Sequence, residues 1–320
     1  MSRRSILVSA VGGDIGVSVA RAIRELDYKI IGCDMREVPL PTGVVDQFYR
    51  VAGATRVEDY FRALDKIIIK ESVEFFIPVC EPEIKILNEH RQRMNALKVK
   101  ILIHHEELLK YFLDKLNTIE YLKKNGVKVP KTSLLKDYNG SFGFPVIVKP
   151  RMGSGGKKNW MIEDLADLNY LRLKDDGSLI AQQYVGKEDE EYTTGIFSDG
   201  KKVSSITFKR RLGPGGLSFE VELVNESFLE NLSRKIANSI NLVGSINLQS
   251  RRIGKIFIPF EINPRLSSTL LFRKQFGFDD CIWWINVLSG GSYTYKRKYR
   301  YGRAIRYLSE CYFDMSDDCK

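Results

Sequence analysis

The chain has 320 residues, 43% hydrophobic and 28% charged, which is ordinary for a globular protein of two or three domains. Its formal net charge of +10 at pH 7 favours anionic partners such as nucleotides, nucleic acid or an anionic lipid surface. The five cysteines are scattered, which argues against a disulfide framework or a zinc site and for a reducing compartment. No apolar run reaches transmembrane length and the N-terminus enters a predicted strand directly, so we expect a cytoplasmic protein without a membrane partner.

The first third of the chain begins with a strand, a glycine-rich turn, a helix and a second strand. The two apolar runs are Ser5–Ala10 and Tyr28–Cys33, the helix pattern extends from about Val17 to Leu26, and Asp34 follows the second run. This order is Rossmann-like and predicts a parallel sheet. Because the glycines at 12–16 do not follow the G-x-G-x-x-G spacing, NAD binding is only an alternative, and the glycines can equally serve helix packing.

Two more predicted strands, Ser72–Pro78 and Val99–Ile103, continue this sheet, and the helix between them extends to about Met94. Open parallel sheets bind ligands at the carboxyl ends of their strands, so the loops after the first strand and after Pro78 are candidate binding loops. Glu81 lies in the second of these loops. It either contacts a substrate or caps the helix that follows, and both interpretations stay open.

The middle third carries a pattern that suits phosphates. After a predicted helix, Glu106–Lys124, a buried strand at Gly143–Pro150 brings Lys149 to its end, and the glycine-rich run Arg151–Lys158 follows at once. The lysine supplies a point charge for phosphate oxygens, and the backbone N–H groups of such a loop can surround them without obstruction by Cβ atoms. The alternative is a basic surface turn.

A further predicted strand, Ser178–Val185, precedes the acidic run Glu188–Glu191. A hairpin follows, with strands at Tyr192–Phe197 and Lys202–Phe208. The segment 209–218 then combines two arginines with a glycine run, and we expect a loop there. Such a loop is either an anion site for a carboxylate or acyl phosphate, or a plain basic loop.

The most informative stretch is Ser245–Arg265, which follows a predicted helix and predicts two strands around a turn at Gly254. Glu261 and Asn263 are two residues apart on the return strand, so both point to one face, and Gln249 on the partner strand can reach that face. Hard oxygen ligands of this kind suit Mg²⁺ bound together with substrate phosphates. The alternative is a hairpin with a solvated glutamate.

Two residues refine this interpretation. Pro259 lacks a donor for the strand ladder, so its position predicts a sheet edge or a bulge. Arg265 directly follows the hairpin and is suited to hold a phosphate oxygen.

The C-terminal stretch Tyr293–Tyr307 alternates aromatic and cationic residues. We favour a strand with one solvated face, and a nucleic-acid platform is the alternative. The three histidines, His90, His104 and His105, lie outside the candidate catalytic stretches, so the sequence assigns no general base.

The string Glu-Ile-Asn-Pro-Arg at 261–265, with the facing Gln249 and the loop after Lys149, resembles the ATP-grasp superfamily, especially its carbamoyl phosphate synthetase branch. The resemblance extends from about Ser5 to about Leu288. It implies an α/β fold class, with a Rossmann-like pre-ATP-grasp domain followed by a two-subdomain ATP-grasp fold (α+β). The expected boundaries are 1–106 for the first domain, 107–185 for the lid subdomain with its linker helix, and 186–320 for the catalytic subdomain with the metal site.

The resemblance also implies residue roles: binding of ATP, binding of Mg²⁺ (with Mn²⁺ as an alternative ion) and stabilisation of oxyanions. The implied ATP-binding residues are Lys115, Lys149, Gly153, Ser154, Gly155, Gly156, Gln182, Gln183, Tyr184, Val185 and Glu191, where another acid of Glu188–Glu191 could take the place of Glu191 at the ribose. The implied metal ligands are Gln249, Glu261 and Asn263, and the implied catalytic residues are Lys149, Arg265 and Arg211, with Arg210 as the alternative to Arg211.

The function implied is an ATP-dependent ligase that joins a carboxylate to an amine (or a thiol) through an acyl phosphate, with release of ADP and phosphate. The chain is shorter than a synthetase large subunit and has one catalytic unit, so we expect a stand-alone ligase for small-molecule substrates rather than carbamoyl phosphate synthesis. A homodimer stays open, and nucleic acid is not an expected partner. The alternative function is a non-catalytic nucleotide- or RNA-binding protein on the same fold.

Overall fold

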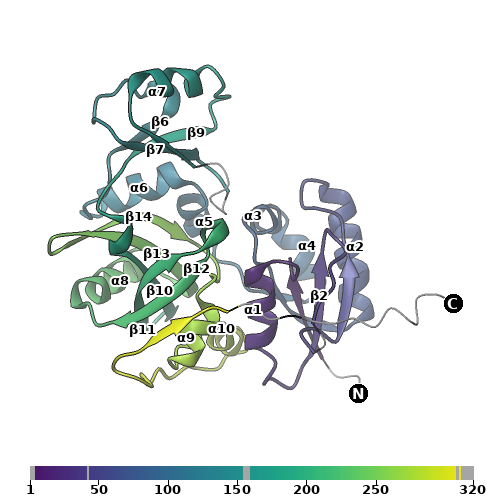
Figure 1. The fold of residues 1–320 in the computed structure, drawn as a ribbon. Helices are drawn as coiled ribbons and strands as arrows, with labels where there is room; N and C mark the ends of the chain where they lie inside the picture. The colour runs from purple at the N-terminus through teal and green to yellow at the C-terminus, as the bar shows by residue number, and fades with distance from the viewer. Residues whose placement is uncertain (1–3, 42, 154–158, 308–309, 311–320) are drawn as a thin grey trace.

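The computed structural model describes residues 4–41, 43–153, 159–307 and 310. Three sheets organise them: a parallel sheet near the N-terminus, a small sheet around β7 (Val146–Pro150) and a large sheet around β10 (Glu191–Asp199). In Figure 1 they lie at the right, at the top and at the lower left, respectively. None of the helices in the described residues is long and apolar enough to cross a membrane.

The N-terminal sheet has five parallel strands in the order β3-β2-β1-β4-β5, which confirms the predicted Rossmann-like arrangement. Its strands are β1 (Ser5–Ser9), β2 (Lys29–Asp34), β3 (Gln47–Arg50), β4 (Val73–Ile77) and β5 (Lys100–Ile101), and its helices are α1 (Asp14–Ala22), α2 (Val57–Lys70), α3 (Glu81–Glu89) and α4 (Arg91–Ala96). The sequence patterns do not predict β3, because this short edge strand is only partly buried and has no apolar run. Strand order reverses between β1 and β4, so the loops that follow them share one crevice.

The carboxylate of Asp34 holds the glycine turn instead of facing a ligand. Its Oδ2 accepts a hydrogen bond from the N–H of Gly12 (3.0 Å), and its Oδ1 accepts one from the N–H of Arg36 (2.9 Å). In a dinucleotide site the acid at this position would bind ribose hydroxyls. The arrangement therefore argues against the NAD alternative.

Two predicted helices are each divided in the structure. The helix expected over residues 106–124 forms α5 (Glu106–Phe112) and α6 (Lys115–Lys124). The division arises because the carboxylate of Asp114 accepts hydrogen bonds from two N–H groups in the first turn of α6 and so starts a new helix. The helix expected to reach Met94 is divided at His90, between α3 and α4, without a side-chain cap.

The small sheet is antiparallel, with the strand order β6-β9-β7-β8. The other elements of this unit are β6 (Thr132–Leu134), β8 (Trp160–Ile162), α7 (Leu165–Arg172) and β9 (Leu179–Gln183). Val146 and Val148 of β7 point into its core, where they pack with Leu168 of α7. The alternation along β7 leaves Lys149 on the opposite face, toward the large sheet.

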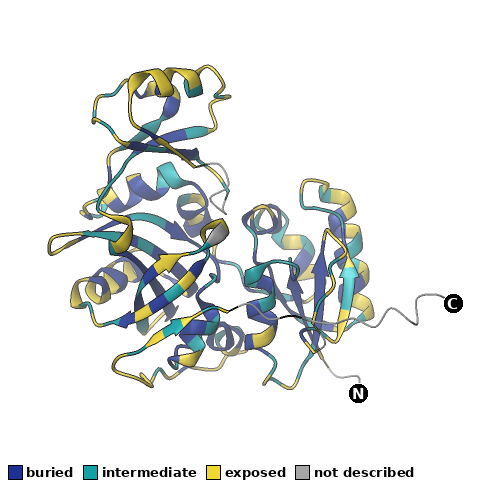
Figure 2. Ribbon diagram, in the orientation of Figure 1, coloured by how far each residue is buried: buried dark blue, intermediate teal, exposed yellow. Residues whose placement is uncertain are grey.

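The large sheet is antiparallel, with the strand order β14-β13-β10-β11-β12-β15. Ile246 and Leu248 pack against α5, α6 and α8 on one face, whereas Phe197 and Phe208 pack against α1, α9 and α10 on the other. Figure 2 shows the resulting band of buried residues along the central strands. The remaining elements are β11 (Val203–Leu212), β12 (Ser218–Val224), α8 (Ser227–Ser239), β13 (Val243–Ile253), β14 (Ile256–Asn263), α9 (Leu270–Gln275), α10 (Asp280–Leu288) and β15 (Arg303–Ile305).

The hairpin of β13 and β14 confirms the predicted turn and the predicted bulge. Gly254 has a φ of +59° in the turn, a conformation that favours glycine. Gln249 pairs with Glu261, and the register shifts at the next pair, which contains Pro259. Because β14 is the edge strand of the sheet, the missing donor of this proline breaks no central ladder.

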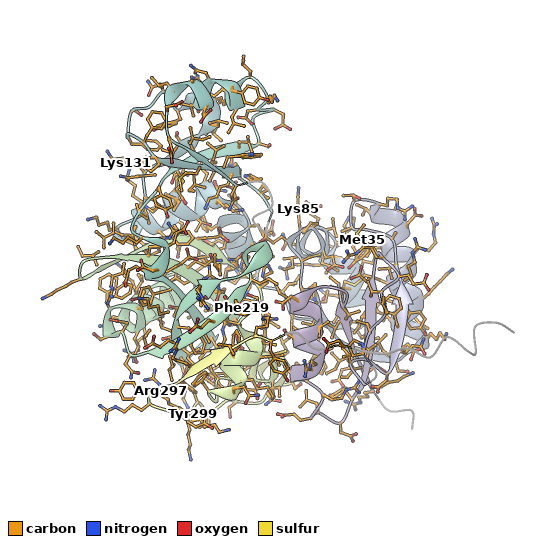
Figure 3. All side chains as sticks on the ribbon, in the orientation of Figure 1. Met35, Lys85, Lys131, Phe219, Arg297 and Tyr299 are labelled. Carbon is orange, nitrogen blue, oxygen red and sulfur yellow. The ribbon has the colours of Figure 1, made fainter. Side chains whose placement is uncertain are left out.

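The strand predicted over Tyr293–Tyr307 is wrong for most of that length. Only β15 pairs, with β12, and the described residues before it in this stretch form no strand. The ring of Tyr293 packs against Trp283, with centroids 5.0 Å apart, while Arg297 projects from the edge of the molecule in Figure 3. Tyr293 is therefore a core residue, whereas Tyr299, Tyr301 and Tyr307 are exposed together with the cations, and the alternation does not mark two faces of one strand.

Candidate active site

A cavity of about 320 Å³ lies between the small sheet, the large sheet and the start of α1. Residues that are far apart in the sequence meet at its walls, and most of the predicted site residues are among them. The predicted residues in the lining are Lys149, Gln182, Gln183, Tyr184, Val185, Glu191, Gln249, Glu261, Asn263 and Arg265.

The hairpin of β13 and β14 brings the three predicted metal ligands together on one wall. The Glu261 Oε1 atom accepts hydrogen bonds from Gln249 Nε2 (3.3 Å) and Asn263 Nδ2 (3.0 Å). Burial alone would raise the pKa of Glu261, but the positive charges of Lys149 and Lys115 outweigh burial and hold that pKa below its ordinary value. Glu261 is therefore a carboxylate at neutral pH and the sole acid of the three.

Lys149 reaches this carboxylate from the end of β7. Its side chain is buried, with Nζ 3.7 Å from Glu261 Oε2 and 5.6 Å from the centroid of the Phe260 ring. Burial lowers the pKa of Lys149, and the attraction of Glu261 compensates only in part. The pair links the small sheet to the large one across the cavity.

The strand β9 and the residues after it form the opposite wall. The N–H groups of Gln183 and Tyr184 are already bonded to the carbonyls of Lys131 (2.8 Å) and Pro145 (3.3 Å). Within the described part of the chain, the N–H of Val185 has no hydrogen-bond partner. The backbone at Val185 can therefore bond to the edge of a ligand.

Glu191 is the one acid of Glu188–Glu191 that lines this cavity. It is buried between two guanidinium groups, with Arg210 Nη2 at 2.7 Å and Arg251 Nη2 at 2.9 Å from its two oxygens. Glu190 instead pairs with cations outside the cavity, chiefly Arg252, which lowers its pKa to about 2.

The arginines at 210 and 211 correct one prediction. They lie in the strand β11, not in a loop, so their side chains alternate between its two faces. Arg210 is buried at the cavity, where Nη2 also donates to Gln249 Oε1 (2.8 Å). Arg211 is exposed and pairs with Glu220 (2.8 Å), outside the cavity lining. The structure therefore places Arg210, and not Arg211, where a catalytic arginine is expected.

Arg265 joins the cavity to the N-terminal sheet. Its Nη2 atom donates to Asn263 Oδ1 (3.2 Å) and lies 3.6 Å from the carboxylate of Glu81, in the first turn of α3. Burial raises the pKa of Glu81, against the attraction of Arg265. The side chain of Glu81 is therefore directed to the site and pairs with Arg265, whereas the residue before α3, Cys80, makes no side-chain cap.

Two family models match the chain: an ATP-grasp domain over residues 112–269 and a PylC-like N-terminal domain over residues 6–102. The chain thus carries an ATP-grasp domain preceded by a PylC-like N-terminal domain. The ATP-grasp match includes the cavity residues on β7, β9, β11 and the β13–β14 hairpin.

Individual relatives are distant. The chain is 24% identical over 205 residues to a carbamoyl phosphate synthase large chain of Campylobacter jejuni, which covers 58% of this chain and 19% of that protein. It is 23% identical over 290 residues to a formate-dependent phosphoribosylglycinamide formyltransferase of Prochlorococcus marinus, which covers 80% of this chain and 68% of that one. The chain thus spans about a fifth of the synthase large chains that it matches.

A solved structure has the same fold at low identity. The biotin carboxylase domain of Hydrogenobacter thermophilus 2-oxoglutarate carboxylase, in complex with MgADP, ADP and bicarbonate, superposes with a TM-score of 0.72. Its sequence identity is 17%, over 93% of this chain and 72% of that one. This likeness shows a shared fold that includes both antiparallel sheets and the parallel sheet that precedes them.

The first residues of the glycine-rich run, 151–153, are held by α6 and the residue before it. Lys115 donates from Nζ to the carbonyl of Gly153, whose φ is +95°, and Arg151 forms a double hydrogen bond with Asp114 (2.8 and 2.9 Å). Lys115 and Gly153 therefore lie together beside the cavity, although neither is in its lining. The predicted loop residues Ser154, Gly155 and Gly156 lie outside the described residues.

Sequence reasoning missed several residues that line this cavity, among them Arg251 and Asn247. The guanidinium of Arg251 lies 4.6 Å from the centroid of the Tyr184 ring. Both residues were detectable, because they are two positions from Gln249 on the same face of one strand.

Proposed function

We propose that this chain is an ATP-dependent ligase that joins a carboxylate to an amine through an acyl phosphate and releases ADP and phosphate. The observation that carries the proposal is the meeting of Glu261, Gln249 and Asn263 with Lys149 in one cavity. The ATP-grasp domain supports it, because the relatives include a carbamoyl phosphate synthase and a formyltransferase. A carboxylate–thiol ligase would use the same first step.

ATP would lie between the two sheets. The N–H of Val185, without a partner among the described residues, suits the edge of the adenine, and Glu191 suits the ribose hydroxyls once one of its guanidinium partners moves aside. Lys149 and Lys115 would hold the phosphates as point charges. The N-terminal domain, through Glu81 and the crevice beside it, would hold the acceptor.

The donor set fits magnesium. Gln249, Glu261 and Asn263 carry one carboxylate and two amide oxygens, all of them hard ligands. Without the ion the amide oxygens accept from Arg210 and Arg265 and the amide nitrogens donate to Glu261, so both amides would turn to bring their oxygens to it. A single negative charge suits an ion that arrives with nucleotide phosphates rather than one bound by protein alone. Mg²⁺ would neutralise charge as the γ-phosphoryl group moves, and Mn²⁺ remains an alternative ion.

Two arginines complete the proposed chemistry. Arg265 and Arg210 both reach the amide oxygens of the metal set, Asn263 and Gln249, respectively. They are therefore close enough to stabilise oxyanions on the transferred phosphoryl group and on the acyl phosphate. Among the described residues no histidine lines the cavity, and His104 is buried against the carbonyl of Ser245 (2.8 Å).

The test is a screen for phosphate release from Mg-ATP in the presence of pools of amino acids and other carboxylates. The proposal predicts release that needs both a carboxylate and an amine pool, with ADP formed in equal amount. Phosphate release that does not depend on any added pool, or the absence of nucleotide binding, would contradict the proposal. RNA retained at physiological salt would favour the non-catalytic alternative instead.

A further inference from the structure

A buried ion pair lies next to the cavity, on the same face of the large sheet. Arg273 of α9 is fully buried, and its Nη1 atom is 2.7 Å from Asp280 Oδ2 of α10. Ser245 of β13 donates to the same carboxylate oxygen (2.5 Å). Because Asp280 compensates the charge of Arg273, this guanidinium is not a free cation for a substrate.

The other terminal nitrogen of Arg273 faces the cavity residues. Its Nη2 atom donates to Asn247 Oδ1 and to Ser267 Oγ (2.8 Å). Gly195 of β10 makes room for this contact, because a Cβ atom there would lie 2.6 Å from the guanidinium carbon. A glycine inside a strand costs stability, so its presence fits a close approach by another group.

This contact fixes which end of the Asn247 amide faces the cavity. Arginine can only donate, so the atom that it contacts must be the amide oxygen. Thr193 Oγ1 also lies 2.9 Å from that oxygen. The amide oxygen is therefore occupied. Asn247 lines the cavity, and its amide N–H group has no hydrogen-bond partner in the described part of the chain, so it can donate to a ligand.

Ser267 completes this network but supplies no donor to the cavity. Its oxygen accepts from Arg273 Nη2 (2.8 Å) and from the N–H of Thr269 (3.4 Å), so its O–H is directed to Thr269 Oγ1 (2.9 Å). Asn247 pairs in register with Asn263, so the donors of Asn247 lie beside the proposed metal set.

We propose that Arg273 is a positioning residue that turns Asn247 so that its amide N–H group faces the substrate end of the cavity. The group bound there is an oxygen that can only accept, the carboxylate of the substrate or the acyl phosphate made from it. The inference rests on the proposed function and names how the carboxylate is held. Arg273 acts only through the side chain of Asn247, which it orients.

The test uses acetonylphosphonate as a probe, a stable isostere of acetyl phosphate in which a methylene group replaces the bridging oxygen. Its binding is measured by calorimetry on protein saturated with Mg-ADP. Asn247→Asp retains the oxygen that faces Arg273 and Thr193 but replaces the donor N–H₂ by an acceptor. We expect the Kd of the probe to rise at least about tenfold, the worth of one hydrogen bond to a charged group, with little change in the Kd of Mg-ADP.

Two further variants separate positioning from folding. Arg273→Lys retains the charge beside Asp280 but loses the planar fork that reaches two partners, so it too should weaken probe binding. Arg297→Lys is the matched control, because Arg297 is exposed and donates to the amide oxygen of Asn225 away from the cavity. Its probe and Mg-ADP affinities should match the wild type.

The outcomes are distinguishable. A network that serves only the fold would lower the Tm of Asn247→Asp and leave its probe affinity unchanged at a temperature below unfolding, which would overturn the inference. Wild-type protein that binds Mg-ADP but no probe would overturn it as well. Failure to bind Mg-ADP would refute the proposed function itself, and the inference with it.

Discussion

Glu261→Gln is the substitution with the largest predicted effect on activity. It retains the shape of the side chain and removes the only negative charge of the metal set. Losing one preorganised contact to a transition state costs about 10²-fold or more in rate, or about 2.7 kcal/mol. We therefore expect kcat for phosphate release to fall at least ~10²-fold.

The same substitution has a structural consequence that can be measured separately. Lys149 lies 3.7 Å from Glu261, and two unit charges at about 4 Å attract by about 4 kcal/mol at an effective dielectric constant of about 20. Without that attraction the pKa of Lys149, already lowered by burial, should fall further. Lys149 would then bind phosphates more weakly, so the Kd of Mg-ATP should rise as well.

The assay is steady-state phosphate release combined with calorimetry of Mg-ATP binding and a thermal melt. Glu230→Gln is the matched control, because Glu230 makes an exposed i,i+4 ion pair with Arg234 on α8, away from the cavity. It should leave both measurements unchanged, since such pairs contribute little. Wild-type turnover in a folded Glu261→Gln protein would refute the metal assignment.

Three further predictions concern other parts of the chain. Arg210→Ala should abolish turnover, because Arg210 lines the cavity. Arg211→Ala should leave turnover within about twofold, because its exposed ion pair contributes little. Equal loss of turnover in both variants would contradict this assignment. Burial lowers the pKa of His104 to about 4. Between about pH 6.5 and 4 the unfolded chain therefore binds a proton that the folded chain does not. The free energy of unfolding should drop by about 3 kcal/mol as the pH falls through this range. Urea unfolding of wild type and His104→Gln at several pH values checks this, and an equal slope in both would refute it. Reversal of Lys296 and Lys298 to glutamate should leave the Kd of Mg-ATP unchanged, since both are exposed and charges beyond a Debye length of about 8 Å are screened; a large change measured by calorimetry would refute this.

The hairpin of β13 and β14 could be predicted because its signals are local. A glycine marks the turn, Pro259 marks the bulge, and the two-residue spacing of Glu261 and Asn263 sets their common face. Apart from β3, the Rossmann-like sheet could also be predicted, since its apolar runs are short and helix patterns separate them from one another. The fold class and the superfamily followed from these stretches.

The errors arose where a distant contact or a cap decides the local structure. The glycine run after Leu212 hid the continuation of β11, which pairs with β12 through Arg211, and so the two arginines were assigned to a loop. The break before α6 depends on one capping carboxylate, that of Asp114. Most of the stretch Tyr293–Tyr307 lacks a strand; its first aromatic rings, Tyr293 and Tyr295, pack into a core formed by other segments, and only β15 pairs.

No local sequence pattern predicts the buried network around Arg273. It joins β13, the segment after Arg265 and two helices, and its members are polar residues that a sequence alone would assign to the surface. Their positions follow only from the packing of α9 and α10 on the large sheet.

The central claim, ligation through an acyl phosphate, is tested most directly by oxygen transfer. The carboxylate that supports phosphate release in the screen is labelled with oxygen-18 and incubated with Mg-ATP, the amine and the protein, and the released phosphate is analysed by mass spectrometry. Attack of the carboxylate on the γ-phosphorus predicts one labelled oxygen in each phosphate, because the carboxylate oxygen leaves with the phosphate when the amine attacks the acyl carbon. Phosphate without label, released at the same rate as the amide forms, would contradict the account.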